Sequence, residues 1–308
     1  MSDNFELLIL LQTKQMLVED LKKLVSGSIE IRDKKYLYIH GREDGIPFTK
    51  YIGEYSEDLY NSLLSNNFAA KEYKKEIKII DKRLKELNYS ETKLSKEVKD
   101  NIDFAKRNLV ESIYNQAILE GVSTTYVDTE SIIDGGKVNN MTSDDILKII
   151  NLKHSWEFIL NENVISSKTD YSLLCSINKL VIEGFYYSAG RIRNIPVNIT
   201  GTNYKPSIPV ESIIKEELER ILSSKENVID KSIELLLYIM KKQIFIDGNK
   251  RSAVLFINHL LISKGKGIIV IPASKVDHFR NLLIDYYENR NIERIKLFLK
   301  EECYKSMV

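Results

Sequence analysis

Apolar residues recur at helical spacing along most of this 308-residue chain, and this feature restricts it to a mainly α fold. Residues 5–26 and 95–119 show the pattern, and from residue 142 onward it is almost continuous. Two further helices are expected to end the chain. The other helices are expected at 54–65, 68–88, 144–165, 170–184, 210–223, 228–242 and 249–264.

The N-terminal third adds a β element to this helical pattern. Two β-rich runs, residues 36–39 and 48–52, flank Asp44-Gly45, and such a turn dipeptide between β-rich runs predicts a β-hairpin. At about 150 residues per domain, the length indicates roughly two structural units. We therefore expect an N-terminal helical and β-hairpin accessory region over residues 1–94 and a helical domain over residues 95–308.

Composition argues against several classes of protein. With 45 Lys and Arg against 44 Asp and Glu, the net charge of +1 gives no strong nucleic-acid signal. No apolar run approaches the roughly 20 residues that a membrane span needs, and two cysteines are too few for a disulfide framework. The N-terminal sequence has an acidic start and no small-residue cleavage site, so we expect a cytoplasmic protein.

The helix expected at 68–88 allows more than one role. Its lysines favour a solvated helix face over a nucleic-acid contact, because acidic residues are interleaved among them. A heptad-like seam runs from Tyr73 to Leu87. Packing of this seam within the chain is favoured over an intermolecular contact, and a homo-oligomer remains an alternative.

The segment between the helices expected at 228–242 and 249–264 carries the clearest chemical signal. Gly248 permits a positive φ, and Asp or Asn beside it can cap the following helix. Lys250 and Arg251 then lie in the first helical turn, where positive charge opposes the helix dipole unless an anion is bound. Free backbone N–H groups with Lys and Arg favour a phosphate site, and Asp247 is a suitable oxygen ligand for Mg²⁺. The alternative is a helix–turn–helix corner with two solvated bases.

This segment, QIFIDGNKR at residues 243–251, resembles the Fic/Doc (Fido) signature H-x-F-x-[DE]-G-N-[GK]-R-x-x-R. Residues 189–193, AGRIR, are similar to the G-x-[YF]-R segment of that family, and residues 199–204 to the flap that holds the target chain. The resemblance covers roughly residues 100–304. It implies a Fic/Doc-type helical bundle with a β-hairpin flap.

A further segment resembles the inhibitory helix of the family, [ST]-x-x-x-E-[GN]. It comprises residues 116–121 and ends with Glu120 and Gly121. The resemblance therefore implies a regulatory role for these two residues and extends the Fic/Doc domain over 95–308, with the inhibitory-like helix at 95–121. Glu at a helix C-terminus is unfavourable to the helix dipole, which favours a cationic partner over simple solvation.

The resemblance also assigns roles around the loop. In the family, ATP is bound by its phosphates and Mg²⁺ by the acidic residue, which corresponds to Asp247. Gly248 and Asn249 would supply backbone N–H groups, and Lys250 and Arg251 would contact phosphate. A motif His takes a proton from a target Ser, Thr or Tyr hydroxyl, which attacks the α-phosphate, so that AMP is transferred to the target protein. That target would be presented near residues 199–206.

The chain departs from the family at three positions. Gln243 replaces the motif His, and a neutral amide cannot accept a proton, so activity should fall by about 10²–10⁴-fold. Val254 replaces the closing Arg that normally pairs with the inhibitory Glu, and Gln116 replaces the Ser or Thr of the inhibitory helix. Glu120 is therefore expected to pair with Arg251, to act as a carboxylate base, or to be merely solvated. His259 is expected to be a helix-face or core histidine.

The resemblance thus favours an ATP–Mg²⁺-binding protein that adenylylates a protein hydroxyl, with Gln243, Asp247, Asn249 and Arg251 as catalytic candidates. Two alternatives follow from the departures. The N-K-R form without the closing Arg also resembles the Doc branch, which would transfer the γ-phosphate as a kinase. The other alternative is a catalytically inactive protein that binds nucleotide and acts as a sensor or interaction protein.

Overall fold

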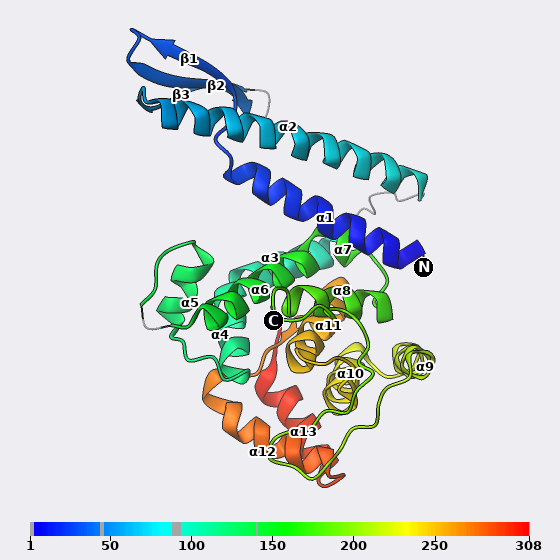
Figure 1. Ribbon diagram of the computed structural model, residues 1–308. Helices are drawn as coiled ribbons and strands as arrows, with labels where there is room; N and C mark the ends of the chain where they lie inside the picture. The colour runs from blue at the N-terminus through cyan, green and yellow to red at the C-terminus, as the bar shows by residue number, and fades with distance from the viewer. Residues whose placement is uncertain (1–2, 44–45, 88–93, 140, 308) are drawn as a thin grey trace. The chain divides into compact units, whose positions relative to one another are not determined.

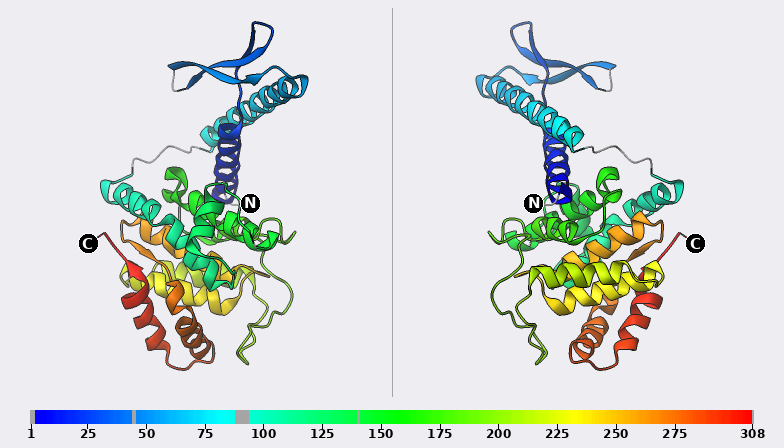
Figure 2. Two further views of the ribbon diagram at one scale, coloured as in Figure 1. Left: turned by 90° about the vertical axis from the view of Figure 1, so that its left-hand side faces the viewer. Right: turned by 90° about the vertical axis from the view of Figure 1, so that its right-hand side faces the viewer.

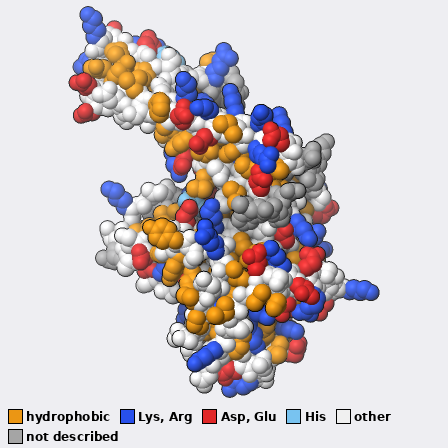
Figure 3. Space-filling view, turned by 45° about the vertical axis from the view of Figure 1, so that its right-hand side comes forward, with side chains coloured by type: hydrophobic (Ala, Val, Ile, Leu, Met, Phe, Trp, Pro, Cys, Tyr) orange, Lys and Arg blue, Asp and Glu red, His pale blue; other side chains and the backbone are white. Residues whose placement is uncertain are grey.

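The computed structural model describes residues 3–43, 46–87, 94–139 and 141–307 (Figure 1). The chain divides into two compact units, unit 1 (Met1–Ser90) and unit 2 (Glu91–Val308). In the described part of the chain, no helix combines the length and apolar character needed to cross a membrane. Basic and acidic side chains are interspersed on the face of unit 2 drawn in Figure 3, in keeping with the net charge of +1.

Unit 1 consists of two helices and a small antiparallel sheet. Its elements are α1 (Asp3–Lys23), β1 (Ser28–Arg32), β2 (Tyr36–Glu43), β3 (Ile46–Glu54) and α2 (Glu57–Glu86). The strand order is β1-β2-β3, and α1 packs on α2. Leu37 and Ile39 of β2 are buried against Leu63 of α2, so the alternation of the strand directs one face of the sheet toward the helix.

Two expectations for unit 1 need correction. The sheet has a third strand, β1, in addition to the two that the β-rich runs predicted, and the Asp44-Gly45 turn lies outside the described residues. The two helices expected at 54–65 and 68–88 are a single helix, α2. The helix continues through Asn67 because the Asn67 amide bonds to the backbone of Gly27 instead of to its own turn.

Unit 2 is almost entirely helical, which confirms the expected fold class. Two short strands, β4 (Ile268–Ile269) and β5 (Tyr304–Lys305), pair with each other. A 3₁₀ turn, η1 (Ala273–Lys275), and a π-helical turn, η2 (Leu299–Cys303), complete the elements. The helices are α3 (Lys96–Arg107), α4 (Leu109–Leu119), α5 (Tyr126–Ile133), α6 (Ser143–Leu160), α7 (Glu162–Ile165), α8 (Tyr171–Val181), α9 (Glu211–Leu222), α10 (Val228–Lys242), α11 (Asn249–Ser263), α12 (Val276–Tyr287) and α13 (Ile292–Phe298).

Helix α11 forms the centre of unit 2. It packs against α3, α6, α8 and α10 and against β4 (Figure 1), and nearly all of its residues are buried. A helix that is covered on every side needs apolar residues all round, which is the pattern of residues 253–262. The first turn of α11 therefore lies at the end of a rigid, buried rod, and the loop before it is held in place by the core.

Three expectations for unit 2 differ from the structure. The helix expected at 144–165 is divided into α6 and α7 at Asn161. The helix expected at 95–119 is two helices, α3 and α4, that meet at Asn108, whose amide donates to the carbonyl oxygen of Phe104 at 2.8 Å. The flap expected as a β-hairpin contains no strand. Residues 183–210 instead form an irregular connection between α8 and α9 (Figure 2), and Thr202 of this connection bonds to Glu288.

His259 lies in the buried part of α11, as a core histidine would. Its side chain is fully buried, with Nδ1 2.9 Å from Thr169 Oγ1 and Nε2 2.9 Å from the carbonyl oxygen of Val164. Burial disfavours the imidazolium and lowers the pKa of His259 from 6.5 to about 4.

This burial predicts a pH dependence of folding stability. Between pH 6.5 and pH 4 the unfolded chain binds a proton at His259 that the folded chain does not, so stability falls as the pH falls. The loss is about 1.4 kcal/mol per pH unit, about 3 kcal/mol in all. Urea unfolding at pH 7 and pH 5 should show a weaker dependence on pH for His259→Gln than for the wild type. Equal dependences would contradict the assignment.

Candidate active site

The segment between α10 and α11 forms a tight turn at the N-terminus of α11. Gln243 ends α10 in the left-handed region, with φ 48°, which redirects the chain into the turn. Its amide Nε2 donates to the carbonyl oxygen of Met240 at 2.7 Å, and its Oε1 accepts from Asn249 Nδ2 at 3.1 Å. Both ends of the amide are therefore engaged within the protein.

Asn249 holds the turn closed. Its Oδ1 accepts from the backbone N–H of Phe245 at 2.9 Å, and its Nδ2 also donates to the carbonyl oxygen of Phe245 at 2.8 Å. Phe245 is fully buried and anchors the turn in the core. With its amide committed to Phe245 and Gln243, Asn249 acts as a positioning residue for the turn.

Only glycine fits the backbone conformation and the space at position 248. Its φ is 75°, and a Cβ at this position would lie 2.6 Å from Cγ2 of Ile182. Asn178 of α8 supports the same backbone, because its Nδ2 donates to the carbonyl oxygen of Asp247 at 3.0 Å. The Oδ1 of Asn178 accepts from the backbone N–H of Gly190, so one amide links the turn to the AGRIR segment.

Asp247 and Arg251 form the polar edge of the turn. Asp247 Oδ1 accepts from the N–H of Gly248 at 2.6 Å, and Oδ2 lies 3.2 Å from Arg251 Nη2. The Asp247 side chain is 43% exposed, whereas the Arg251 side chain is 3% exposed. A buried guanidinium thus faces a carboxylate that remains open to solvent.

Glu120, at the C-terminal end of α4, lies against the same cations. Its Oε1 is 3.2 Å from Lys250 Nζ, and its Oε2 is 3.2 Å from Arg251 Nε. Burial opposes ionisation of Glu120, but the charges of Lys250 and Arg251 outweigh it and hold the pKa of the carboxyl below its usual value. Of the three expectations for Glu120, pairing with Arg251 is therefore the one that the structure shows. Gly121 follows with φ 79° and ends the helix.

Gln116 fixes Glu120 over the turn. Its Nε2 donates to the carbonyl oxygen of Arg251 at 2.9 Å, and its Oε1 accepts from Trp156 Nε1 at 3.1 Å. Gln116 and Trp156 are buried, and the links join α4 and α6 to the first turn of α11. The departure from Ser or Thr at position 116 thus creates a rigid connection between the inhibitory-like helix and the motif.

Arg193 connects the turn to the irregular segment 183–210. Its guanidinium donates to the carbonyl oxygens of Gln243, Ile195 and Ser207, and its backbone N–H donates to the carbonyl oxygen of Ile244 at 3.0 Å. The role of Arg193 as an internal brace does not follow from the sequence. The roles of Gln116 and Asn178 do not follow from the sequence either, because nothing in it distinguishes them from the other polar residues of α4 and α8.

The residues present fit a phosphate with Mg²⁺. Among the described residues, Arg251 Nε is a buried donor without a hydrogen-bond partner, although Glu120 lies within ion-pair distance. The N-terminus of α11 has no side-chain cap, so its first N–H groups are available to an anion. Asp247 keeps lone pairs that none of its protein contacts use, and an exposed carboxylate is a typical Mg²⁺ ligand.

Comparisons with known proteins agree with this geometry. Residues 168–261 match the family model described as the Fic/DOC family. No curated protein matches the sequence. The matched segment lies within unit 2 and includes the AGRIR segment, the turn and most of α11.

Three solved structures share the fold. Fic-1 (residues 134–508) from C. elegans is 16% identical, with a TM-score of 0.53 and 79% of each chain covered. A Fic domain containing signaling protein from Bacteroides thetaiotaomicron is 19% identical, with a TM-score of 0.51 and coverage of 68% of this chain and 86% of that one. A Fic family protein from Desulfovibrio desulfuricans is 14% identical, with a TM-score of 0.53 and coverage of 68% and 73%.

Proposed function

We propose that unit 2 binds ATP with Mg²⁺ at residues 247–251 and slowly transfers AMP to a hydroxyl group of a target protein. The observation that carries the proposal is the uncapped N-terminus of α11, which has Lys250 and Arg251 in its first turn and the exposed carboxylate of Asp247 beside it. Arg251, Lys250 and the backbone N–H groups would bind the phosphates. Asp247 would hold Mg²⁺, which neutralises phosphate charge when bound.

In this reaction the hydroxyl oxygen of the target forms a bond to the α-phosphorus. The bond between that phosphorus and the oxygen bridging to the β-phosphate breaks, and pyrophosphate leaves. The hydroxyl proton passes to water, because Gln243 has no basic atom and its amide is held by Met240 and Asn249. Orientation and charge stabilisation by Arg251 and Lys250 are the catalytic contributions that remain.

The bonded amide of Gln243 also favours a second candidate, a nucleotide-binding protein that transfers nothing. In that case the ion pairs of Glu120 with Lys250 and Arg251 would be the element that senses nucleotide. A third candidate is a Doc-like kinase. It is suggested by Lys250 and by Val254, which stands where the family motif has its closing Arg. Binding of ATP is common to all three, whereas group transfer separates them.

Calorimetric titration of the full chain tests the binding site. ATP should bind more tightly with Mg²⁺ than without it, and Asp247→Asn should lower the affinity in Mg²⁺ by about ten-fold, which is about 1.4 kcal/mol. Asp285→Asn is the matched control, because Asp285 also pairs with an arginine but on α12. Affinities that do not change with Mg²⁺, or equal effects of the two substitutions, would contradict the role of Asp247.

A further inference from the structure

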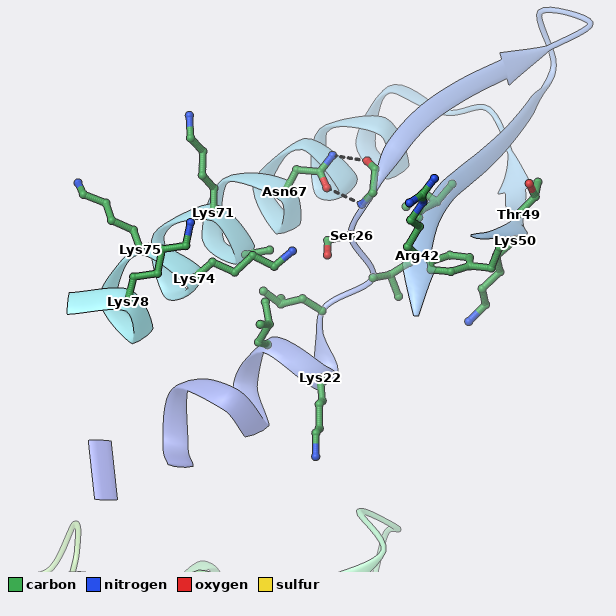
Figure 4. A pocket seen from close by; sticks show the side chains of 18 residues that line it. Lys22, Ser26, Arg42, Thr49, Lys50, Asn67, Lys71, Lys74, Lys75 and Lys78 are labelled. Atoms are coloured by element: carbon green, nitrogen blue, oxygen red, sulfur yellow. Dashed lines mark hydrogen bonds between the residues drawn. The ribbon is translucent and has the colours of Figure 1, made fainter. Parts of the chain in front are cut away.

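Unit 1 contains a groove that the Fic/DOC chemistry does not use. It lies between the C-terminal end of α1, the connection to β1, the inner face of β2 and β3, and the middle of α2 (Figure 4). Its volume is about 1190 Å³, which exceeds that of a typical small-molecule pocket. All of the lining residues belong to unit 1.

The groove is strongly basic. Among the residues that the structure describes, its lining contains no Asp or Glu. Lys75 lies 3.8 Å from Glu72, and no other basic side chain of the lining has an acidic partner within 4.0 Å in the described part of the chain. The basic residues of the lining are Lys22, Arg42, Lys50, Lys71, Lys74, Lys75 and Lys78.

Four of these lysines form one stripe on α2. Lys71, Lys74, Lys75 and Lys78 are spaced by three, one and three residues, which places them on one side of the helix. Figure 4 shows Lys74 extending from α2 toward Ser26 across the groove, while Lys71 and Lys75 extend to the outer side of α2. Like charges at i,i+4 destabilise a helix, so this stripe costs stability unless an anion is bound.

Two charged residues nearer the C-terminal end of α2 have partners on α1. Asp81 pairs with Lys14 at 2.7 Å, and Arg83 pairs with Glu6 at 2.7 Å, both on α1. These two charges of α2 are therefore compensated within unit 1. Lys82 and Lys85 also have no acidic partner within 4.0 Å among the described residues, but they lie outside the groove and not around one cavity.

The groove is preformed. The Asn67 amide of α2 donates to the carbonyl oxygen of Gly27 at 2.9 Å and accepts from the N–H of Gly27 at 2.8 Å (Figure 4). A Cβ at Gly27 would overlap the carbonyl oxygen of His40, so the connection passes close to β2. These contacts fix the α1–β1 wall against α2 without a ligand.

The floor of the groove is apolar. Phe48 of β3 lies opposite Gly41 of β2, and a Cβ at Gly41 would be 2.6 Å from the Phe48 ring. The ring thus covers the glycine and remains half-buried at the groove. The other apolar side chains of the lining are Leu21, Leu24, Val25, Ile39 and Ala70.

We propose that this groove binds a single strand of nucleic acid, with the phosphates at the basic rim and bases against the apolar floor. Single-strand sites combine a basic groove with an aromatic surface on which bases stack. A duplex encloses the faces of its bases and would leave the floor unused. An acidic peptide offers charge without planar apolar faces, and a membrane surface is not concave. The lysines of α2 are exposed, as the solvated helix face expected from the sequence requires, and the proposal adds an anionic ligand to that face.

The test is fluorescence anisotropy of the full chain with a labelled oligothymidine of about 15 nucleotides, without ATP. Lys74→Ala/Lys78→Ala should weaken binding by about ten-fold or more. It should also reduce the slope of log K against log salt by about 1.4, because each phosphate contact contributes about 0.7 for single strands. Lys82→Ala/Lys85→Ala is the matched control, since both lysines are exposed on α2 and outside the groove. It should change the affinity by less than about three-fold.

A second variant tests the floor. Phe48→Leu keeps the apolar volume and removes the aromatic face, and it should weaken binding by about five-fold or more without changing the salt slope. Circular dichroism verifies that each variant is folded. The proposal is overturned if the wild type does not bind or if the two lysine pairs have equal effects. Tighter binding of a duplex, a polyglutamate peptide or phosphatidylserine vesicles than of the single strand would also overturn it.

Discussion

Gln243→His is expected to accelerate AMP transfer by about 10²–10⁴-fold, the usual contribution of a general base. Gln243 ends α10 beside the turn, and its side chain lies within hydrogen-bond distance of Asn249 and of the Met240 carbonyl. An imidazole at this position can donate one N–H to that carbonyl and leave its other nitrogen free to accept the hydroxyl proton. The substitution therefore adds the general base that Gln243 cannot supply.

The rate is measured with ATP labelled on the α-phosphate and a cytosolic extract as the source of targets. Gln243→Asn is the control, because it changes the side chain and adds no base. An increase with His and none with Asn would show that the base alone is missing. No transfer by Gln243→His, although it binds ATP as the wild type does, would favour the nucleotide-binding protein without transfer activity.

Glu120→Gln is expected to raise the affinity for ATP–Mg²⁺ by about 10–100-fold. Glu120 forms ion pairs with Lys250 and Arg251, the cations that we propose bind the phosphates, so carboxylate and nucleotide would compete for them. The expected gain corresponds to a coupling free energy of about 1–3 kcal/mol, the usual size when one group biases the binding of another. Without nucleotide the same variant should be less stable, because Lys250 loses its carboxylate partner and the buried Arg251 loses one of its two.

Calorimetric titration and thermal unfolding, each with and without ATP–Mg²⁺, measure both effects. Glu111→Gln is the matched control, because Glu111 is on the same helix and pairs with Lys305, away from the turn. It should leave the affinity unchanged. If Glu120→Gln binds ATP no better than the wild type does, the ion pairs are structural and Glu120 has no inhibitory role.

The sequence predicted most of the helical fold because apolar periodicity reports which side of a helix is buried. It failed where a single polar side chain decides the backbone. Asn108 bonds to the carbonyl oxygen of Phe104 and separates α3 from α4, whereas Asn67 bonds to Gly27 and lets α2 continue. The same residue type thus ends one helix through a local bond and not the other, where a tertiary contact that periodicity does not contain engages the amide.

The turn at residues 243–251 could be predicted because its glycine and its charges have local causes. The left-handed φ of Gly248 and the cations in the first turn of α11 can both be predicted from the sequence. The hydrogen bonds that support the turn could not be predicted, because Gln116 and Asn178 reach it from α4 and α8, more than 60 residues away in the chain. Likewise, the strandless segment 183–210 depends on Arg193 and its bonds to distant carbonyl oxygens.

The most direct test of the central claim, that the turn uses ATP to modify a protein hydroxyl, is transfer of label from ATP tagged on either the α- or the γ-phosphate. Purified full chain is incubated with a cytosolic extract and Mg²⁺, and Lys250→Ala/Arg251→Ala serves as the blank. We expect a weak protein band labelled from the α-phosphate only and absent from the blank. A band labelled only from the γ-phosphate, or bands equal to the blank with both labels, would contradict the account.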